Sequence, residues 1–119
     1  MSNSIEYTGV IESDRVAFFD CDDTLILWKH HDLDLPTVTI NGRVFQVHTK
    51  HLQKIHDYHV MGFTVFVWSN SGHKWAKTVS EALGVADKVI AMCKPHRVFD
   101  DCKDLNDTIG SGYLKLEDK

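Results

Sequence analysis

The stretch Val16–Leu25 reads V-A-F-F-D-C-D-D-T-L and decides how the rest of the chain is interpreted. Arg15–Phe19 places β-branched and aromatic residues on both faces, which predicts a strand buried on both sides, as in a parallel sheet covered by helices. Three aspartates and a threonine then follow within five residues. Like charges at such close range indicate either a solvated turn or a cation shared between the carboxylates, and the rest of the sequence decides between them.

Length and composition predict one soluble domain covering residues 1–119. The chain is 43% hydrophobic and 25% charged, as in ordinary globular proteins. No apolar run approaches the roughly 18–20 residues needed to cross a bilayer, so no membrane association is expected. The net charge of −4 gives no support to general nucleic-acid binding, although local charge can still bind a small phosphorylated substrate.

Cysteine usage and the N-terminal residues bear on the compartment. The three cysteines form no repeated C-x-x-C pairs, and residues 1–7 show no basic segment followed by an apolar run. A reduced, cytoplasmic location is therefore expected. Nothing in the sequence fixes the oligomeric state, and a homo-oligomer remains possible.

The chain beyond residue 25 alternates strand and helix patterns, which indicates an α/β fold with a mainly parallel sheet. An Asn41-Gly42 turn between alternating runs predicts a β-hairpin. The further predicted elements are a helix within 49–60, a strand at 63–68, a helix at 73–83 with Ser71 near its N-cap, and strands at 88–92 and 97–99.

Ligands of such sheets bind beyond the carboxyl ends of the strands, so the polar residues found there are the candidate site. Carboxylates there would hold Mg²⁺, which prefers a few carboxylates together with substrate oxygens and water. A hydroxyl, an amide and an ammonium would donate to phosphoryl oxygens. The residues at the four strand ends are Asp20, Asp22, Asp23 and Thr24; Ser69 and Asn70; Lys94; and Asp100 and Asp101.

These strand ends resemble, in order, the four motifs of the haloacid dehalogenase (HAD) superfamily. F-F-D-C-D-D-T-L is similar to its D-x-D-x-T motif, V-F-V-W-S to its second, Lys94-Pro95 to its third and V-F-D-D to its fourth. The resemblance implies a Rossmann-like three-layer sandwich. Residues 25–48 are too few for a helical cap domain, so a capless member with a small β-hairpin flap is expected.

The resemblance also implies a phosphatase that acts on phosphate monoesters with Mg²⁺. Asp20 would be the nucleophile that forms a phosphoaspartyl intermediate, and Asp22 the general acid and base. Thr24 would orient Asp22, Ser69 and Asn70 would bind the phosphoryl group, and Lys94 would bridge phosphate and nucleophile. Asp20 and Asp22 would hold the metal, together with Asp101 as a ligand supported by Asp100.

Two features depart from the family pattern. Asp23 stands where many members have glycine. The interval between Lys94 and Asp100 is short, which leaves the fourth strand and the choice among Asp100, Asp101 and Asp104 as metal ligand open.

Two other functions compete with the phosphatase. A phospho-accepting receiver domain also forms a phosphoaspartate, but it carries its acidic pair after the first strand and its acceptor after the third, and it needs no acid two residues beyond the acceptor. A HAD-like domain that only binds a partner is the third reading, although no motif residue is missing. Trp68 and Trp75 are interpreted as packing residues, and Trp28 and Phe45 as candidates to line the flap.

Overall fold

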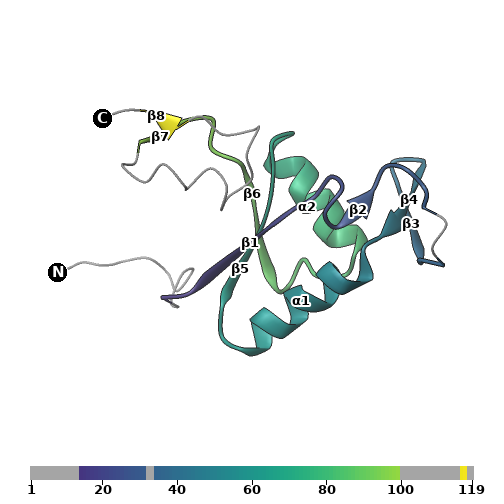
Figure 1. Cartoon of the computed structure of the whole chain (residues 1–119), viewed down its shortest axis with the longest axis horizontal. Helices are drawn as coiled ribbons and strands as arrows, with labels where there is room; N and C mark the ends of the chain where they lie inside the picture. Colours follow the sequence, from purple (N-terminus) through teal and green to yellow (C-terminus); the bar gives the residue numbers. More distant parts are fainter. Residues whose placement is uncertain (1–13, 32–33, 100–115, 118–119) are drawn as a thin grey trace.

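The computed structural model describes residues 14–31, 34–99 and 116–117 of the chain. Figure 1 shows two helices beside a central set of strands, with a small second sheet at one end of the molecule. The elements in chain order are β1 (Val16–Asp20), β2 (Ile26–Leu27), β3 (Thr37–Ile40), β4 (Arg43–Val47), α1 (Thr49–Val60), β5 (Thr64–Ser69), α2 (His73–Ala82), β6 (Val89–Cys93), β7 (Val98–Phe99) and β8 (Leu116–Glu117).

The central sheet is parallel, with the strand order β1-β5-β6. Phe18 is in register with Phe66, which is in register with Ile90, so the three strands end at the same edge. Their β-branched and aromatic residues explain why these segments form strands, since such side chains fit the pleated surface of a sheet. The predicted α/β class and mainly parallel sheet are confirmed.

Both helices pack on the same face of this sheet. Ile55 of α1 and Ala76 and Val79 of α2 belong to one buried cluster with Val65 and Val67 of β5. This is the outcome expected when two successive crossovers are right-handed and progress in the same direction across the sheet. Within the described ranges no helix is long and apolar enough to span a bilayer.

The other face of the sheet presents aromatic rings. Phe18 stacks on Phe66 with ring centroids 4.7 Å apart, and its centroid lies 4.4 Å from that of Trp68. Alternation along a strand puts these residues opposite Val65 and Val67. The described residues therefore supply one helical layer and the sheet, and the second helical layer of the expected three-layer sandwich does not come from them.

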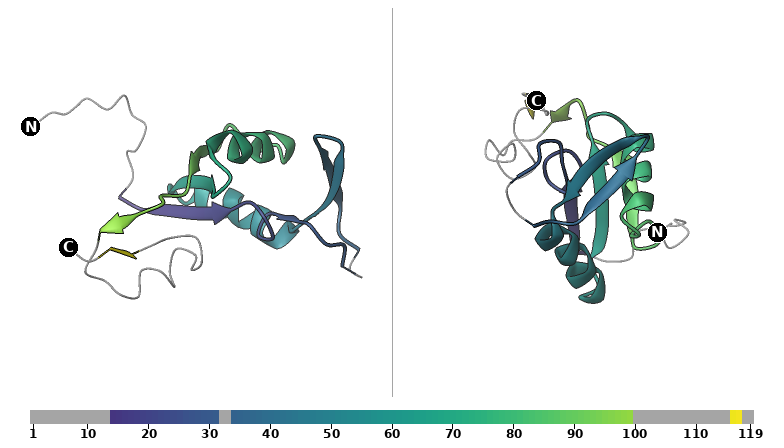
Figure 2. Two further views of the ribbon diagram at one scale, coloured as in Figure 1. Left: turned by 90° about the horizontal axis from the view of Figure 1, so that it is seen from above. Right: turned by 90° about the vertical axis from the view of Figure 1, so that its right-hand side faces the viewer.

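The hairpin flap forms as predicted and gains one strand. Strands β3 and β4 pair antiparallel around Asn41 and Gly42, whose positive φ angles of 51° and 80° are those that a tight hairpin turn requires. The two residues of β2 pair with the other edge of β4, making the sheet β2-β4-β3. Figure 2 shows this small sheet beyond the end of the central strands.

The prediction that residues 97–99 extend the central sheet is wrong. Strand β7 pairs in parallel with β8 in a separate two-stranded sheet. Residues 94–97 alone separate β7 from β6. A parallel neighbour in the same sheet needs a crossover of about a dozen residues or more, so this link is too short.

The helix caps differ from the sequence-based expectation. Gly72, not Ser71, is the N-cap of α2, and it forms no side-chain capping bond. The N-cap of α1 is His48, whose Nδ1 accepts a hydrogen bond from the His51 amide at 3.2 Å. The two imidazole rings stack with centroids 3.6 Å apart. Burial, and next the neighbouring His51, lower the pKa of His48 below its ordinary value of 6.5.

We expect the His48 cap to make stability depend on pH. A lowered folded-state pKa means that its stabilising contribution is present above the unfolded value of about 6.5 and is lost as the pH falls through the folded value. Protonation also removes the Nδ1 acceptor. Urea unfolding between pH 7.5 and 5 should show a smaller loss of stability for His48→Asn, which caps without titrating, than for the wild type. Equal losses in both proteins would contradict this role.

Candidate active site

Three of the predicted site residues meet at the carboxyl edge of the central sheet. Asp20 ends β1, Ser69 ends β5 and Lys94 directly follows β6. Ser69 is in register with Cys93, and the Lys94 amide donates to the Ser69 carbonyl at 3.0 Å. The parallel register alone therefore brings together residues that are 25 or more positions apart in the sequence.

The buried Lys94 forms an ion pair with the partly exposed Asp20. The Lys94 Nζ lies 3.5 Å from the Asp20 Oδ1, and Lys94 is only 3% exposed. The same ammonium stands 5.7 Å from the centroid of the Trp68 ring, and the Cys21 amide donates to Asp20 Oδ1 at 2.9 Å. A lysine is almost never buried without such partners, so the pairing accounts for its position.

The surroundings of Asp20 leave its negative charge incompletely balanced. Burial raises the pKa of Asp20 above its ordinary value; Lys94 and the Cys21 amide oppose this rise, while the nearby Asp22 adds to it. A second cation beside Asp20 would stabilise the ionised form. The carboxylate oxygens are hard donors of the kind that Mg²⁺ prefers, so this position fits a divalent cation.

Asp22 is held by two tryptophans that sequence analysis did not connect to it. Its Oδ1 accepts the indole N–H of Trp28 at 2.8 Å and that of Trp75 at 3.1 Å. Trp28 follows β2 in the flap, and Trp75 lies on α2. The ring of Phe45 packs against both indoles, at centroid distances of 4.9 and 6.4 Å. Trp75 was predicted to be a packing residue, and its indole N–H also donates a hydrogen bond to Asp22. No spacing pattern in the sequence indicated this hydrogen bond.

The loop after β1 is tightly folded. The Cys21 carbonyl accepts from the amides of Thr24, Leu25 and Ile26 at 3.0–3.3 Å. Asp23 has a φ of 62°, a left-handed conformation that Asp tolerates and glycine adopts freely. Its carboxylate accepts from the Trp28 amide at 3.2 Å. Asp23 therefore has a structural role at the position where many HAD sequences have glycine.

Cys21 is not a competing nucleophile. Its side chain is fully buried, and burial together with Asp22 and Asp20 raises its pKa to about 12. Because the thiolate is the reactive form, this cysteine is inert at neutral pH.

Thr24 contributes its backbone to a contact with the helix α1. Its carbonyl lies 2.7 Å from the Nδ1 of His51. In the part of the chain that the structure describes, the hydrogen bonds to the Asp22 carboxylate come from the indoles, so the role of Thr24 in orienting Asp22 stays a prediction. His51 thus ties α1 to the loop that carries the candidate acid.

Ser69 and Asn70 occupy the predicted place after β5. The Ser69 hydroxyl accepts from the Ser71 amide at 3.0 Å, which leaves its proton for another acceptor. Ser69 has no exposed surface, whereas Asn70 is exposed. Binding of a phosphoryl group by these two residues stays a prediction.

Part of the predicted metal shell lies outside the described residues. Asp100, Asp101 and Asp104 all fall in that region, and nothing distinguishes them as ligands. Within the described ranges, no three His, Cys, Asp or Glu side chains are grouped to hold a metal ion. Asp20 and Asp22 supply two positions, and a complete shell needs further ligands.

Comparison with protein-family models, curated proteins and solved structures gave no match. The likeness to the HAD superfamily therefore rests on the four ordered motifs and on the arrangement of Asp20, Asp22, Ser69 and Lys94.

We predict that Asp22 controls two of the three tryptophan indole N–H signals in a ¹⁵N–¹H spectrum. Asp22→Ala removes the shared acceptor, so the signals of Trp28 and Trp75 should move upfield and exchange faster with water. Trp68 should move less. Asp23→Ala is the matched control, because Asp23 accepts from the Trp28 amide rather than from its indole. Unchanged indole signals in Asp22→Ala would refute the shared hydrogen bond.

Proposed function

We propose that this chain is a Mg²⁺-dependent phosphomonoester hydrolase of the HAD type that uses Asp20 as its nucleophile. The observation that carries the proposal is the ion pair between the buried Lys94 and Asp20, placed beside a second carboxylate that two indoles hold in position. The proposed setting is the reducing cytoplasm, in keeping with the free thiols of Cys21 and Cys93.

In the first step an Asp20 carboxylate oxygen attacks phosphorus. A new bond forms between this oxygen and phosphorus while the bond to the leaving oxygen breaks. Lys94 offsets the repulsion between the carboxylate and the anionic phosphoryl group. Protonated Asp22 gives its proton to the leaving oxygen, and such assistance is typically worth about 10²–10⁴-fold in rate.

In the second step water attacks the phosphorus of the phosphoaspartate. Asp22, now ionised, takes a proton from the water, and the bond between Asp20 and phosphorus breaks. Inorganic phosphate leaves, and Asp20 returns as a carboxylate. Both indoles donate to Oδ1 of Asp22. The other carboxylate oxygen of Asp22 is therefore the one that exchanges this proton.

The Asp20 carboxylate, the Asp22 backbone carbonyl and an aspartate among residues 100–104 would hold the magnesium ion. When bound, the ion supplies positive charge that polarises the phosphoryl group and neutralises charge in the transition state.

A receiver domain remains the second candidate, because it also uses aspartates, a lysine and Mg²⁺. The structure favours the hydrolase through one feature. Asp22 lies next to Asp20, and indoles from two separate elements hold its carboxylate in position. The proposed hydrolase needs an acid at this place, whereas a receiver domain does not. A HAD-like domain that only binds a partner would not need a buried Lys94 paired with Asp20.

Mg²⁺-dependent hydrolysis of p-nitrophenyl phosphate is the direct test. We expect Asp20→Asn to lower kcat/KM by at least about a thousandfold, because the amide cannot attack phosphorus. Asp23→Asn is the matched control: it makes the same change in the same loop and should retain most of the activity.

Activity that survives Asp20→Asn would refute the nucleophile assignment. A phosphoaspartate that forms on Asp20 but persists, with negligible phosphate release, would instead favour the receiver function. Absence of both products with folded protein would favour the binding module.

The two indoles should matter most for esters whose leaving oxygen needs a proton. We expect Trp75→Phe and Trp28→Phe to lower kcat/KM about 10-fold for an alkyl phosphate and much less for p-nitrophenyl phosphate, since p-nitrophenolate leaves without protonation. The measurement is kcat/KM against leaving-group pKa.

Phe45→Leu is the control for packing, because Phe45 touches both rings without bonding to Asp22. If Phe45→Leu gives the same dependence on the leaving group, or if the tryptophan variants slow both esters equally, the indoles do not act through Asp22.

A further inference from the structure

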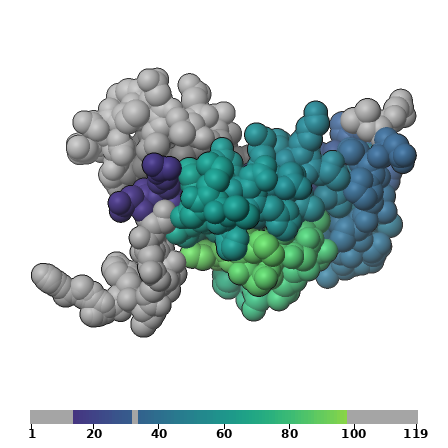
Figure 3. Space-filling view, turned by 90° about the horizontal axis from the view of Figure 1, so that it is seen from below, coloured from purple at the N-terminus to yellow at the C-terminus, as the bar shows by residue number. Residues whose placement is uncertain are grey.

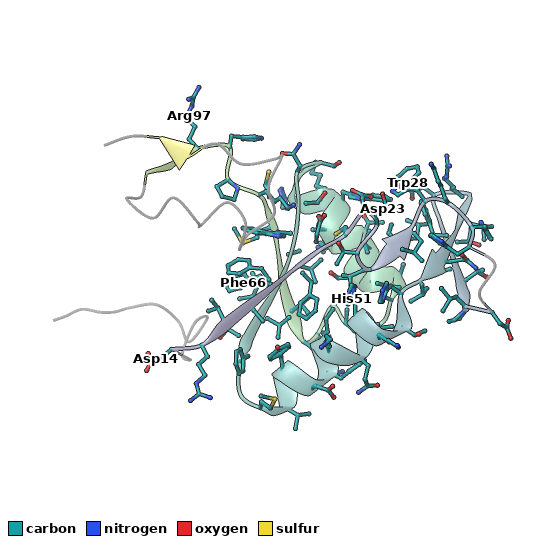
Figure 4. All side chains as sticks on the ribbon, viewed as in Figure 1. Asp14, Asp23, Trp28, His51, Phe66 and Arg97 are labelled. Atoms are coloured by element: carbon teal, nitrogen blue, oxygen red, sulfur yellow. The ribbon has the colours of Figure 1, made fainter. Side chains whose placement is uncertain are left out.

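A groove of about 660 Å³ opens between the flap and the start of α1. Asp23, Trp28 and Lys50 are among the residues that line it. Figure 4 shows Asp23 and Trp28 close together at the flap end of the molecule, and Figure 3 shows the surface of α1 adjoining that of the flap. The volume falls within the range of small-molecule pockets.

One wall of the groove is apolar, and one residue of that wall bonds to the candidate acid. It consists of Leu27, Trp28 and Leu35. The indole N–H of Trp28 bonds to Asp22, and Trp28 is also a lining residue of the groove, with the Arg43 guanidinium 4.4 Å from its ring centroid. Trp28 is therefore the residue that joins the groove to the candidate acid.

The rim of the groove is cationic, in contrast to the chain as a whole. Its positive charge comes from Lys29 and Lys50, whereas the lowered pKa of His48 favours a neutral imidazole, and Asp23 is the one acidic residue that lines the groove. The carboxylate of Asp23 is already engaged by the Trp28 amide. The whole chain carries a net charge of −4, so a local excess of positive charge favours an anionic ligand here.

Contacts within the flap hold the groove in shape. Gln46 is buried, its side-chain oxygen accepts from the His31 amide at 2.6 Å, and its side-chain nitrogen donates to the His31 carbonyl at 3.3 Å. On the other side, the His48 amide donates to the Leu25 carbonyl at 2.9 Å. Two backbone segments that line the groove are thus fixed to the flap before any ligand binds, which lowers the ordering cost of binding.

We propose that this groove binds the leaving group of the substrate, and that this group has a ring-bearing apolar body and a second negative charge. A nucleotide that carries a phosphate in addition to the one removed has this chemistry. The proposal rests on the proposed phosphatase function, because it assigns the groove to the part of the substrate that Asp22 protonates.

The test compares adenosine 3′,5′-bisphosphate with adenosine 5′-monophosphate, which has the same ring and one phosphate fewer. We expect kcat/KM to be at least about 10-fold higher for the bisphosphate, and the preference to shrink at high salt because exposed charges are screened. The double variant Lys29→Gln/Lys50→Gln should remove most of this preference by lowering kcat/KM for the bisphosphate far more than for the monophosphate.

Lys77→Gln/Lys74→Gln is the matched control, since both lysines are exposed on α2 and neither lines the groove. It makes the same change in net charge and should keep the preference. If the two double variants behave alike, the effect is one of overall charge and the groove assignment is wrong.

Binding provides a second readout that needs no turnover. Titration calorimetry with Asp20→Asn should show tighter binding of the bisphosphate than of the monophosphate, and Lys29→Gln/Lys50→Gln should abolish the difference. Equal binding of both nucleotides, together with hydrolysis of p-nitrophenyl phosphate, would overturn the groove proposal and leave the phosphatase intact. Tighter binding of the bisphosphate without hydrolysis of any ester would overturn the phosphatase instead.

A short oligonucleotide with a terminal phosphate presents the same ring and a second phosphate. If the oligonucleotide is hydrolysed and this hydrolysis depends on Lys29 and Lys50, the groove proposal is supported and the substrate is a nucleic-acid end. If only the free bisphosphate is hydrolysed, the groove proposal is supported and the substrate is a free nucleotide.

Discussion

The Asp20–Lys94 ion pair is the interaction on which the candidate site depends. A lysine that is 3% exposed requires a carboxylate close by, and a carboxylate among buried neighbours requires a cation. The pair exists because β1 and β6 both neighbour β5 in parallel register, so their carboxyl ends lie at one edge of the sheet. The pKa of Asp20 remains raised because burial outweighs the opposing effects of Lys94 and the Cys21 amide. Under the proposed function, a bound cation would favour the ionised form of Asp20.

The second carboxylate is positioned by quite different means. Asp22 has two neutral indole donors, one from the flap and one from α2. A neutral donor can hold a carboxylate in place without the strong preference for the ionised form that an ammonium would impose. Under the proposed mechanism, Asp22 must be able to bind and release a proton, whereas Asp20 must stay ionised. The different partners of the two aspartates suit these different tasks.

The flap connects the second carboxylate to the groove. Trp28 donates its indole N–H to Asp22 and is also a lining residue of the groove, while Phe45 links it to Trp75 on α2. The residues of this small flap thus contact Asp22 through Trp28 and also line the groove, and under the proposed function they would orient the acid and form a wall for the leaving group.

The sequence by itself determined the strand that ends in Asp20, the Asn41-Gly42 hairpin, the two helices and the set of polar residues at strand ends, because local periodicity and turn chemistry depend on neighbouring residues. Only the tertiary structure decided that Trp28 and Trp75 share Asp22, that Gln46 clamps the flap, and that β7 leaves the central sheet for β8. Trp75 lies 53 positions from Asp22, and Gln46 lies 15 positions from His31. No periodic pattern encodes such contacts, since they form only when the packing of separate elements brings an N–H and an acceptor to within hydrogen-bonding distance.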